Sequence, residues 1–324
     1  MPAYPERHAL PMGRLMPNSF LARLPLSRYE VDRDYLTRDR PDAIGHLLQD
    51  PTTRLLPLFQ GSALLSGPAS LALVPASALP PAELYIYLGR SLSETSPEPV
   101  GTPIVAAVLA DAGHLAESDW GNLRQLGSLL SDRDAGLFTE ALGVANWHAT
   151  HAFSPKTGVA TTPGKAGWVR VDPTTGGELY PRTDAAIIVG ITDSHDRLLL
   201  GSNALWESNR FSLLAGFVEP GESLEAAVVR EVFEESGINV VDPIYLGSQP
   251  WPFPASLMLG FTARVDPAIE SLLTPDGNEI LELRWFSRDE LRAALGDILL
   301  PGPTSIARSI IELWFGGPID DLSA

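Results

Sequence analysis

The stretch from Gly216 to Ile238, GFVEPGESLEAAVVREVFEESGI, is the most informative part of this sequence. A short strand over Phe211–Phe217 is predicted to lead into a turn and then a helix. The helix is expected to begin near Ser223, because a serine side chain there can accept a hydrogen bond from a free N–H group of the first turn. It is expected to end at Gly237, the residue type that most easily leaves helical geometry. The segment therefore predicts a strand, a loop and a helix in succession.

Glutamates crowd one face of this predicted helix. At about 100° per residue, Glu231, Glu234 and Glu235 fall within an arc of about 100°, and Arg230 lies about 40° beyond Glu234. Neighbouring carboxylates repel one another, so a face that binds cations explains the cluster better than an ordinary solvated acidic face. Oxygen ligands of this kind suit Mg²⁺ or Mn²⁺. The apolar residues of the helix are expected to face the core: Val229, Val232 and Phe233.

The same stretch resembles the Nudix box, a glycine followed by five residues, a glutamate, seven residues and then Arg-Glu-apolar-x-Glu-Glu-x-Gly-apolar. Every specified position of the pattern is filled. The matching residues are Gly216, Glu222, Arg230, Glu231, Val232, Glu234, Glu235, Gly237 and Ile238. The resemblance implies a Nudix hydrolase, an enzyme that cuts a diphosphate with water and divalent metal ions.

The resemblance also implies roles for the box residues. Glu231 and Glu235 are expected to bind the metals, Mg²⁺ or Mn²⁺, with more than one ion present. Glu222 and Arg230 are expected to hold the loop against the helix. Glu234 and Glu235 both remain candidates for the general base, and Glu235 is favoured.

A second motif, SQPWPFPAS, follows the box at residues 248–256. By itself it predicts a stiff loop displaying two aromatic rings, which could fill a core or contact a second copy of the chain. It is similar to the signature of NADH pyrophosphatases, and this resemblance implies that the segment binds the dinucleotide. Rigid rings suit stacking on its bases, and Phe217 is a further stacking candidate. The substrate-binding residues implied are Gln249, Pro250, Trp251, Pro252, Phe253, Pro254, Ala255 and Ser256.

Shorter matches extend the resemblance on both sides of the box. Tyr180 lies in a Tyr-Pro-Arg sequence ahead of the first strand of the domain and is expected to contact the substrate, as is Ala307. Glu279 is expected to add a carboxylate to the metal site, and Ala215 a backbone carbonyl. An exposed strand edge is the alternative interpretation of Glu279 and Glu282.

One departure from the family pattern is clear. The family commonly carries four zinc-binding cysteines ahead of Tyr180, whereas this sequence has Ser154, Thr157, Asp172 and Thr175 at those positions. One carboxylate and three hydroxyls do not make a tetrahedral zinc site. No structural zinc is therefore expected, and packing is expected to hold the connector instead.

Helical periodicity extends over residues 118–148 in the first half of the chain. Three glycines interrupt it, so two short helices are expected in place of one: Gly127, Gly136 and Gly143. His148 and His151 follow near its end. Two histidines without further metal ligands are interpreted as structural residues.

The order of these elements predicts two domains joined by a connector. We expect a flexible tail over 1–28, a mixed α/β N-terminal domain over 29–147, a connector over 148–182, a catalytic Nudix domain over 183–317, and a second tail over 318–324. The expected fold class is α+β, with an α/β/α sandwich in which a mixed sheet lies between helices. No internal repeat is recognised in the sequence.

Composition limits the possible functions. The 324 residues include 40 acidic and 23 basic ones, which gives a formal charge of −17, and 44% are hydrophobic. A core can form, whereas broad binding to nucleic acid or anionic lipid, which needs surplus lysine and arginine, is disfavoured. The sequence shows no run of about 18 apolar residues and no signal peptide, which predicts a cytoplasmic protein. The absence of cysteine excludes thiolate chemistry and disulfides.

Together these features predict hydrolysis of NADH or NAD⁺ to NMNH or NMN and AMP, with removal of NAD caps from RNA as a further activity. ADP-ribose or another nucleoside diphosphate derivative is the alternative substrate. A non-catalytic nucleotide sensor is the alternative function, but such a protein would be expected to lack box acids, and none is missing here. The family resemblance further implies a homodimer with no membrane partner.

Overall fold

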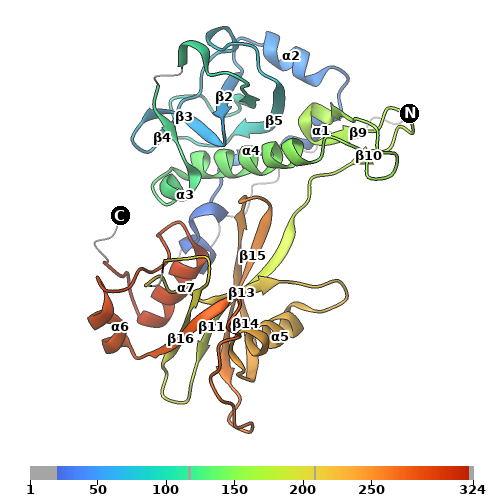
Figure 1. The fold of residues 1–324 in the computed structure, drawn as a ribbon. Coiled ribbons are helices and arrows are strands. Elements are labelled where there is room, and N and C mark those ends of the chain that lie inside the picture. Colours follow the sequence, from blue (N-terminus) through green and yellow to red (C-terminus); the bar gives the residue numbers. More distant parts are fainter. Residues whose placement is uncertain (1–19, 116–117, 208, 321–324) are drawn as a thin grey trace, which may run out of the picture.

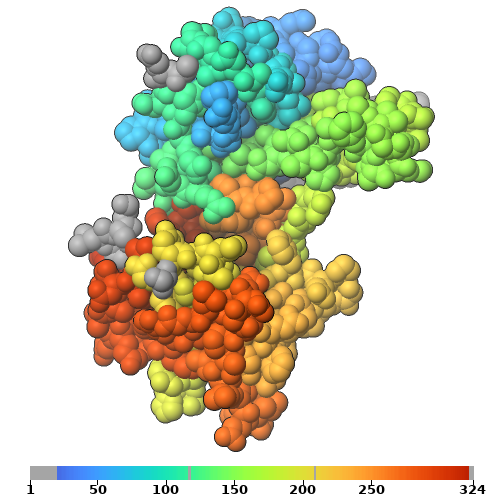
Figure 2. Space-filling view, in the orientation of Figure 1, coloured from blue at the N-terminus to red at the C-terminus, as the bar shows by residue number. Residues whose placement is uncertain are grey.

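Two halves of the chain form separate sheets in the computed structural model, which describes residues 20–115, 118–207 and 209–320 (Figure 1). The N-terminal half begins with two 3-10 helices, η1 (Phe20–Arg23) and η2 (Pro25–Ser27). Its long helix α4 (Asp132–Thr150) lies along the boundary with the C-terminal half. In the space-filling view of Figure 2 the N-terminal half, blue to green, lies against the yellow-to-red C-terminal half.

The N-terminal sheet contains one parallel pair of strands among antiparallel ones. Its order is β1-β5-β6-β2-β3-β4, with β7 paired to β3, and β2 runs parallel to β6. One face packs against α4, whereas α2 covers the other face at Leu55 and Tyr87. The strands are β1 (Val31–Asp32), β2 (Arg54–Phe59), β3 (Ser62–Gly67), β4 (Ser70–Leu71), β5 (Leu84–Ser91), β6 (Pro103–Val108) and β7 (Trp120–Gly121). The shorter helices are α1 (Tyr35–Arg38), α2 (Ala43–Gln49), α3 (Leu123–Leu126), η3 (Ala76–Ala78) and η4 (Gly113–Leu115).

The helix predicted over residues 118–148 is divided at Gly127 into α3 and α4. Gly136 and Gly143 lie inside α4, so the prediction that they interrupt the helix is wrong. A Cβ at Gly136 would lie 2.8 Å from the Cβ of Tyr29, so glycine there lets the segment after η2 pack directly on the helix. Of the helices in the described residues, α4 included, none is long and apolar enough to cross a membrane.

The C-terminal sheet lies between two helices. Its order is β14-β15-β11-β12-β16, with β13 paired to β11, and β11 runs parallel to β15. Along β11, Ile187 and Val189 enter the core under α5, whereas Ile188 enters the core under α7. This arrangement confirms the expected α/β/α sandwich. The elements are β11 (Asp184–Thr192), β12 (Leu198–Asn203), β13 (Leu214–Phe217), β14 (Val240–Trp251), β15 (Ser256–Val265), β16 (Ile280–Phe286), α5 (Leu224–Ser236), α6 (Arg288–Ala294) and α7 (Ile306–Phe315).

The two sheets share one strand order, although no repeat is recognisable in the sequence. The set β5-β6-β2-β3 corresponds to β14-β15-β11-β12, because in each set the outer pairs are antiparallel and the central pair is parallel. The halves differ in the connection from β4 to β5 and in the corresponding connection from β13 to β14. Helix α5 connects β13 to β14, whereas residues 72–83, which connect β4 to β5 and are all described, contain only η3 as a helical turn.

The connector between the halves has structure of its own. Three short antiparallel strands form a sheet of order β10-β9-β8 beside the 3-10 turn η5 (Lys165–Gly167). The strands are β8 (Thr162–Gly164), β9 (Val169–Val171) and β10 (Glu178–Leu179). A connector of this length without internal structure would be unusual in a compact protein. Here the backbone pairing of the three strands supplies that structure.

The residues at the positions of the zinc ligands gather around the Asp172 carboxylate. Thr157 Oγ1 donates to it at 2.6 Å, and the N–H groups of Thr174 and Thr175 donate at 2.8 and 3.3 Å. The Ser154 side chain also bonds to it. These hydrogen bonds, that of Thr157 foremost, hold the pKa of Asp172 well below its usual range. Hydrogen bonds thus tie the two turns of the connector together, in addition to the expected packing.

Replacing Asp172 with alanine is expected to loosen the connector. Because the folded chain lowers the pKa of this carboxyl, its contribution to stability is present above the ordinary value of 3.8 and is lost as the pH falls towards the lowered value. At pH 7 we expect a lower melting temperature and faster amide exchange at residues 174 and 175. Asp50→Ala removes a carboxylate that caps a similar turn in the N-terminal half, and this variant serves as the control. Unchanged exchange at residues 174 and 175 in the Asp172 variant would contradict this account.

Both predicted tails are partly packed. Of the spans 1–28 and 318–324, residues 1–19 and 321–324 lie outside the described residues. Leu24 and Ile319, from opposite ends of the chain, are buried in one core of the C-terminal half. The tail predictions are therefore wrong for residues 20–28 and 318–320, because their apolar side chains remove surface from water by packing on that core.

Candidate functional site

Helix α5 begins and ends where the sequence predicts. The Ser223 hydroxyl accepts the Ala226 N–H at 3.2 Å, and Gly237 ends the helix with a φ of +69°. The preceding strand β13 is shorter than predicted, since it covers only Leu214–Phe217. Strand, loop and helix nevertheless follow one another as expected, so the box residues are held between the sheet and the helix.

One side of α5 is more exposed than predicted. Val232 is fully buried, but Val229 and Phe233 are 39% and 52% exposed. The sheet contacts a narrow stripe that includes Ala227 and Val228. Val229 and Phe233 lie about 100° around the helix from the residues before them, beyond the edge of that stripe. The prediction that both face the core is wrong.

Gly216 lets the Glu231 side chain lie directly against β13. A Cβ at Gly216 would be 2.0 Å from Glu231 Cδ and 2.1 and 2.2 Å from its two carboxylate oxygens. The φ of Gly216 is not positive, so glycine is needed here for space and not for backbone conformation. The box glycine therefore sets the position of the first predicted metal-binding carboxylate.

Arg230 joins the loop to the helix through several acceptors. Its Nε and Nη2 atoms both donate to the Glu222 carboxylate, Nε at 3.0 Å, and Nη2 also donates to the Phe217 carbonyl at 3.0 Å. Its Nη1 atom lies 2.9 Å from Glu231 and 3.0 Å from Glu234. The hydrogen bond with Arg230 lowers the pKa of Glu222. Glu222 and Arg230 thus make the contacts expected of residues that brace the loop.

Glu235 is the buried carboxyl of the group. It is 5% exposed, its Oε2 atom has no hydrogen-bond partner, and the Ala215 backbone bonds to it. Burial, followed by repulsion from Glu279, Glu231 and Asp276, raises the pKa of Glu235 to about 8. Most buried polar atoms in proteins have a partner. An unpartnered carboxylate oxygen among other acids is an arrangement that a bound cation would relieve.

A turn before β16 presents Glu279 to this group. Asp276 accepts the three successive N–H groups of Asn278–Ile280 at 3.2, 3.0 and 2.7 Å, which fixes the turn. Asn203, at the end of β12, donates to Glu279 Oε1 at 3.4 Å. Asp276 and Asn203 are not among the site residues predicted from the sequence. The Asp-Gly-Asn sequence signals the turn, but only the folded chain shows which carboxylates the turn approaches.

The donors present fit a divalent cation. Glu231, Glu235 and Glu279 come from α5 and from the turn before β16, and the charge of Glu279 acts on both of the others. Hard oxygen donors of this kind are those that Mg²⁺ and Mn²⁺ prefer. Within the described ranges no three acidic or histidine side chains are already close enough to enclose an ion. The carboxylates therefore converge without completing a coordination shell.

Two family models match this chain. The NUDIX domain matches residues 181–302, and the NADH pyrophosphatase-like rudimentary NUDIX domain matches residues 52–147. A relative from Mycobacterium bovis (strain BCG / Pasteur 1173P2) is 47% identical over 227 residues, which cover 67% of this chain and 68% of the relative. The chain belongs to the NADH pyrophosphatase family of Nudix proteins. The N-terminal match also accounts for the strand order that the two halves share.

The relatives carry informative names. The protein from Mycobacterium bovis is called NAD-capped RNA hydrolase NudC. A protein from Salmonella agona (strain SL483) has the same name. It is 40% identical over 197 residues, which cover 60% of this chain and 71% of that protein. Among solved structures, a NUDIX hydrolase from Nitrosomonas europaea aligns with a TM-score of 0.41 and 20% identity, over 51% of this chain and 94% of that one.

In this Nudix protein the segment 249–256 joins the two halves. Gln249 is fully buried, accepts the Leu26 N–H at 3.3 Å and donates to the Thr304 carbonyl at 3.0 Å. Pro254 is exposed. Most of the other residues of the segment line a cavity between the halves: Pro250, Trp251, Pro252, Ala255 and Ser256.

The two rings of that segment already have neighbours. Trp251 and Phe253 meet edge to face with 4.9 Å between ring centroids, and Arg124 of α3 lies 4.0 Å from the Phe253 ring. Asn146 of α4 donates to the Pro252 carbonyl at 2.9 Å. These contacts favour the packing interpretation of the motif over a free stacking platform. Its predicted role in substrate binding stays a prediction.

Two other predicted aromatic residues are accessible. Phe217 and Tyr180 are 60% and 63% exposed. Ala186 pairs with both Phe217 and Met258, so Phe217 and the 249–256 turn lie at the same end of the sheet. Ala307 is 2% exposed and packs in the core under α7, and its predicted contact with the substrate stays a prediction.

The histidine pair has partners within the protein. His148 Nε2 lies 2.7 Å from the Gly167 carbonyl, and Arg170 donates to Nδ1 at 3.0 Å. His151 Nδ1 lies 2.9 Å from the Thr150 hydroxyl. Burial lowers the pKa of His148, which favours the neutral ring. The interpretation of these residues as structural histidines agrees with their contacts.

Divalent metal is expected to stabilise the metal-free protein most strongly at alkaline pH. Because the folded pKa of Glu235 is raised to about 8, the stability that its proton supplies is complete below 4.5 and is lost as the pH rises through 8. A cation replaces that proton. In differential scanning fluorimetry we expect millimolar Mg²⁺ to raise the melting temperature by a few degrees at pH 8.5 and by less at pH 6. Sodium chloride at equal ionic strength is the control, and equal effects of both salts would contradict the prediction.

Proposed function

We propose that this chain hydrolyses the diphosphate of NADH or NAD⁺ to NMNH or NMN and AMP, and that it also removes NAD caps from RNA. The observation that carries the proposal is the buried Glu235 carboxylate, whose Oε2 atom has no hydrogen-bond partner, beside Glu231 and Glu279. It lies in a complete Nudix box, in a chain that is 47% identical to a protein named NAD-capped RNA hydrolase.

The expected cofactors are Mg²⁺ or Mn²⁺, with more than one ion per site. Glu231, Glu235 and Glu279 would hold them, with a backbone carbonyl from Ala215. Such ions neutralise the diphosphate and lower the pKa of bound water. These three carboxylates fit the role because Glu231 and Glu235 are buried or partly buried and the charge of Glu279 repels both, which a cation would relieve.

The chain's own contribution is to hold these acids in place and to accept a proton. Glu235 is the favoured base, because its Oε2 atom has no other partner. Glu234 remains the second candidate, but its carboxylate is occupied by Arg230 at 3.0 Å. Phe217 and Tyr180 are exposed rings that can stack on nicotinamide or adenine.

A direct comparison of substrates tests the proposal. NADH, NAD⁺, ADP-ribose and an NAD-capped RNA are offered at equal concentration with Mg²⁺ or Mn²⁺, and products are followed by mass spectrometry. We expect NMNH or NMN with AMP, and NMN with a 5′-monophosphate RNA. The charge of −17 favours contact with the RNA end over the length of its backbone. Faster cleavage of ADP-ribose would support the alternative substrate, and binding without turnover would support a nucleotide sensor.

We further propose that the protein works as a cytoplasmic homodimer. The proposal follows from the family resemblance and is tested by light scattering during size-exclusion chromatography and by fractionation of the source cells. A mass of one chain at micromolar concentration would overturn the dimer.

A further inference from the structure

Arg124 of helix α3 is a positive charge without a carboxylate partner. Within the described residues seven arginines lie over an aromatic ring, and six of these also pair with a carboxylate at 3.7 Å or less. The Arg124 guanidinium makes no ion pair and no hydrogen bond with any described residue. The chain has 40 acidic and 23 basic residues, so partners are plentiful. The six paired arginines are Arg33, Arg38, Arg197, Arg284, Arg288 and Arg292.

The rings beneath Arg124 belong to the segment 249–256. The guanidinium lies 4.0 Å from the centre of the Phe253 ring and 5.1 Å from that of the Trp251 ring. The rings shield it partly from water, and this burial lowers the pKa of Arg124 with no acid to offset the effect. Because an arginine stays charged in proteins, the rings hold the charge in place without neutralising it. The residue as a whole is exposed, so the charge is accessible to an anion from solution.

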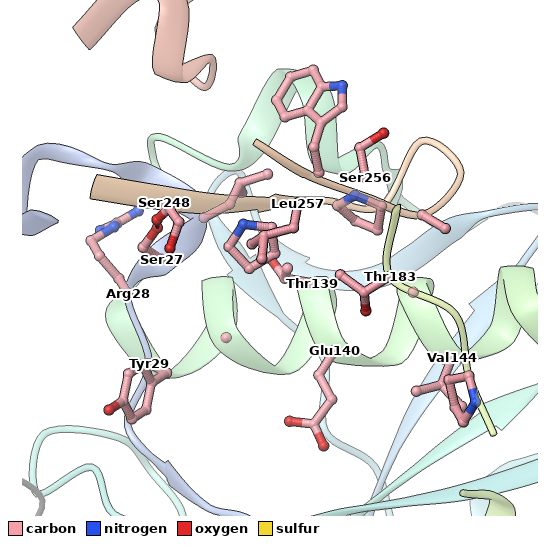
Figure 3. A pocket seen from close by; sticks show the side chains of 18 of the residues that line it. Ser27, Arg28, Tyr29, Thr139, Glu140, Val144, Thr183, Ser248, Ser256 and Leu257 are labelled. Carbon is pink, nitrogen blue, oxygen red and sulfur yellow. Dashed lines mark hydrogen bonds between the residues drawn. The ribbon is translucent and has the colours of Figure 1, made fainter. Parts of the chain in front are cut away.

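The same segment borders a cavity of about 500 Å³ between the halves (Figure 3). Trp251 lines this cavity, and Figure 3 shows Ser256 and Thr183 together there, as the pairing of Ser256 with Asp184 requires. Thr183 directly follows the Tyr-Pro-Arg sequence that begins at Tyr180. Arg124 therefore meets the segment from the N-terminal half, whereas the end of the connector meets it at Ser256.

The turn after α3 also contacts the residues before α7. Ser128 donates its backbone N–H to Thr304 Oγ1 at 3.2 Å. Thr304 lies three residues before Ala307, which is predicted to contact the substrate. Four residues of helical backbone rise by about 6 Å, so Arg124 lies about one turn from Ser128. Arg124 thus has predicted substrate-binding residues on two sides, in the 249–256 segment and at the start of α7.

We propose that Arg124 binds a phosphate on the adenosine ribose of the substrate, in addition to the diphosphate that is cut. The inference rests on the proposed function. The diphosphate belongs at Glu231, Glu235 and Glu279, whose charges do not act on Arg124. NADH has only the two phosphates of that bridge. An NAD-capped RNA carries a further phosphate on the 3′ oxygen of its adenosine, and NADPH carries one on the 2′ oxygen.

The chemistry of Arg124 suits such a phosphate. The N–H groups of a guanidinium form a planar fork that matches two phosphate oxygens. The formal charge of −17 repels an anion from the protein as a whole, so affinity for a third phosphate has to come from a nearby positive group. Arg124 is therefore expected to favour NAD-capped RNA or NADPH over NADH.

Isothermal titration calorimetry on the full chain with Mg²⁺ tests the proposal. AMP, adenosine 3′,5′-bisphosphate and adenosine 2′,5′-bisphosphate are titrated separately. None of them contains a diphosphate bridge, so the result does not depend on turnover. We expect the better bisphosphate to bind about tenfold more tightly than AMP, because it adds charge-assisted hydrogen bonds. Preference for the 3′ isomer would assign the site to RNA, and preference for the 2′ isomer would assign it to NADPH.

Variants separate the charge of Arg124 from its packing. Arg124→Met keeps an apolar stem over the rings but lacks the charge, so the preference for a bisphosphate should disappear while the affinity for AMP stays nearly unchanged. Arg124→Lys should keep part of the preference, because it retains the charge without the planar fork. Arg292→Met is the matched control. Arg292 lies 5.0 Å from the Phe315 ring but pairs with Asp289, so its loss should leave the preference intact.

Three results would overturn the proposal: equal affinities of AMP and both bisphosphates for the unaltered chain, an Arg124→Met variant that binds all three nucleotides more weakly to the same degree, or no binding of any of them at millimolar concentration. The second result is what a purely structural role for Arg124 predicts. Failure of the proposed function would look different. A chain that prefers a bisphosphate but leaves every dinucleotide intact would retain this site and refute the hydrolysis.

Discussion

Glu235→Gln is expected to lower kcat for NADH hydrolysis by about 10²–10⁴-fold while leaving the protein as stable as the wild type or more stable. The loss of rate follows from removal of a charge from the predicted metal site and of the favoured base. The gain in stability follows from the raised pKa of about 8, because above this pH the folded chain holds an ionised, buried carboxylate with one oxygen unpartnered, a charge that glutamine lacks. The measurements are initial rates with saturating Mg²⁺ and melting curves in EDTA at pH 6 and pH 8.5.

Two variants on the same helix serve as controls. Glu234→Gln changes a carboxylate whose side chain is 57% exposed and paired with Arg230, and should cost less activity than Glu235→Gln if Glu235 is the base. Glu225→Gln changes an exposed residue of the first turn, away from the converging acids, and should have little effect. A Glu235→Gln protein that hydrolyses NADH at the wild-type rate would refute the proposed chemistry.

Gly216→Ala is expected to reduce kcat/KM by about 100-fold, since displacing a catalytic group by about 1 Å can have an effect of this size. The alanine Cβ would lie 2.0–2.2 Å from the Glu231 carboxylate group, so Glu231 must move away from β13. Because Arg230 contacts Glu231 as well as Glu222, that movement should also disturb the loop. Steady-state kinetics across a range of Mg²⁺ concentrations should show that half-maximal activity needs more Mg²⁺ than in the wild type. That result would identify the displaced Glu231 as the cause.

Gly302→Ala is the matched control in the same domain. A Cβ at Gly302 would have no neighbour within 4 Å, and its φ is not positive, so this substitution should leave activity and stability nearly unchanged. Normal kinetics and an unchanged metal requirement in Gly216→Ala would show that the close approach of Gly216 and Glu231 has no importance for the site.

The local features of the site were predictable because they depend on residues near one another in the chain. Helix α5 begins after Ser223 and ends at Gly237, as capping chemistry predicts. The pairing of Arg230 with Glu222 spans only eight residues and needs no distant contact. Period-two alternation along β11 likewise follows from strand geometry, although which face each helix covers does not.

Contacts between distant residues had to come from the folded chain. The sequence shows a stiff aromatic loop at residues 249–256, but packing of its rings on α3 and α4 depends on how the halves meet. Similarly, apolar residues in the supposed tails are buried by a core formed far away in sequence. The repeated strand order is invisible in the sequence because it rests on the order and direction of strands and not on repeated residues.

The amino-acid sequence alone determined the helix with its acids, the family, and the expected chemistry, since short-range spacing places those carboxylates on one helical face. Tertiary structure alone decided that the Glu235 Oε2 atom is buried without a hydrogen-bond partner and that Asp276 and Asn203 position Glu279. The physical reason is that burial and long-range electrostatics depend on which surfaces come together, and no local pattern records that.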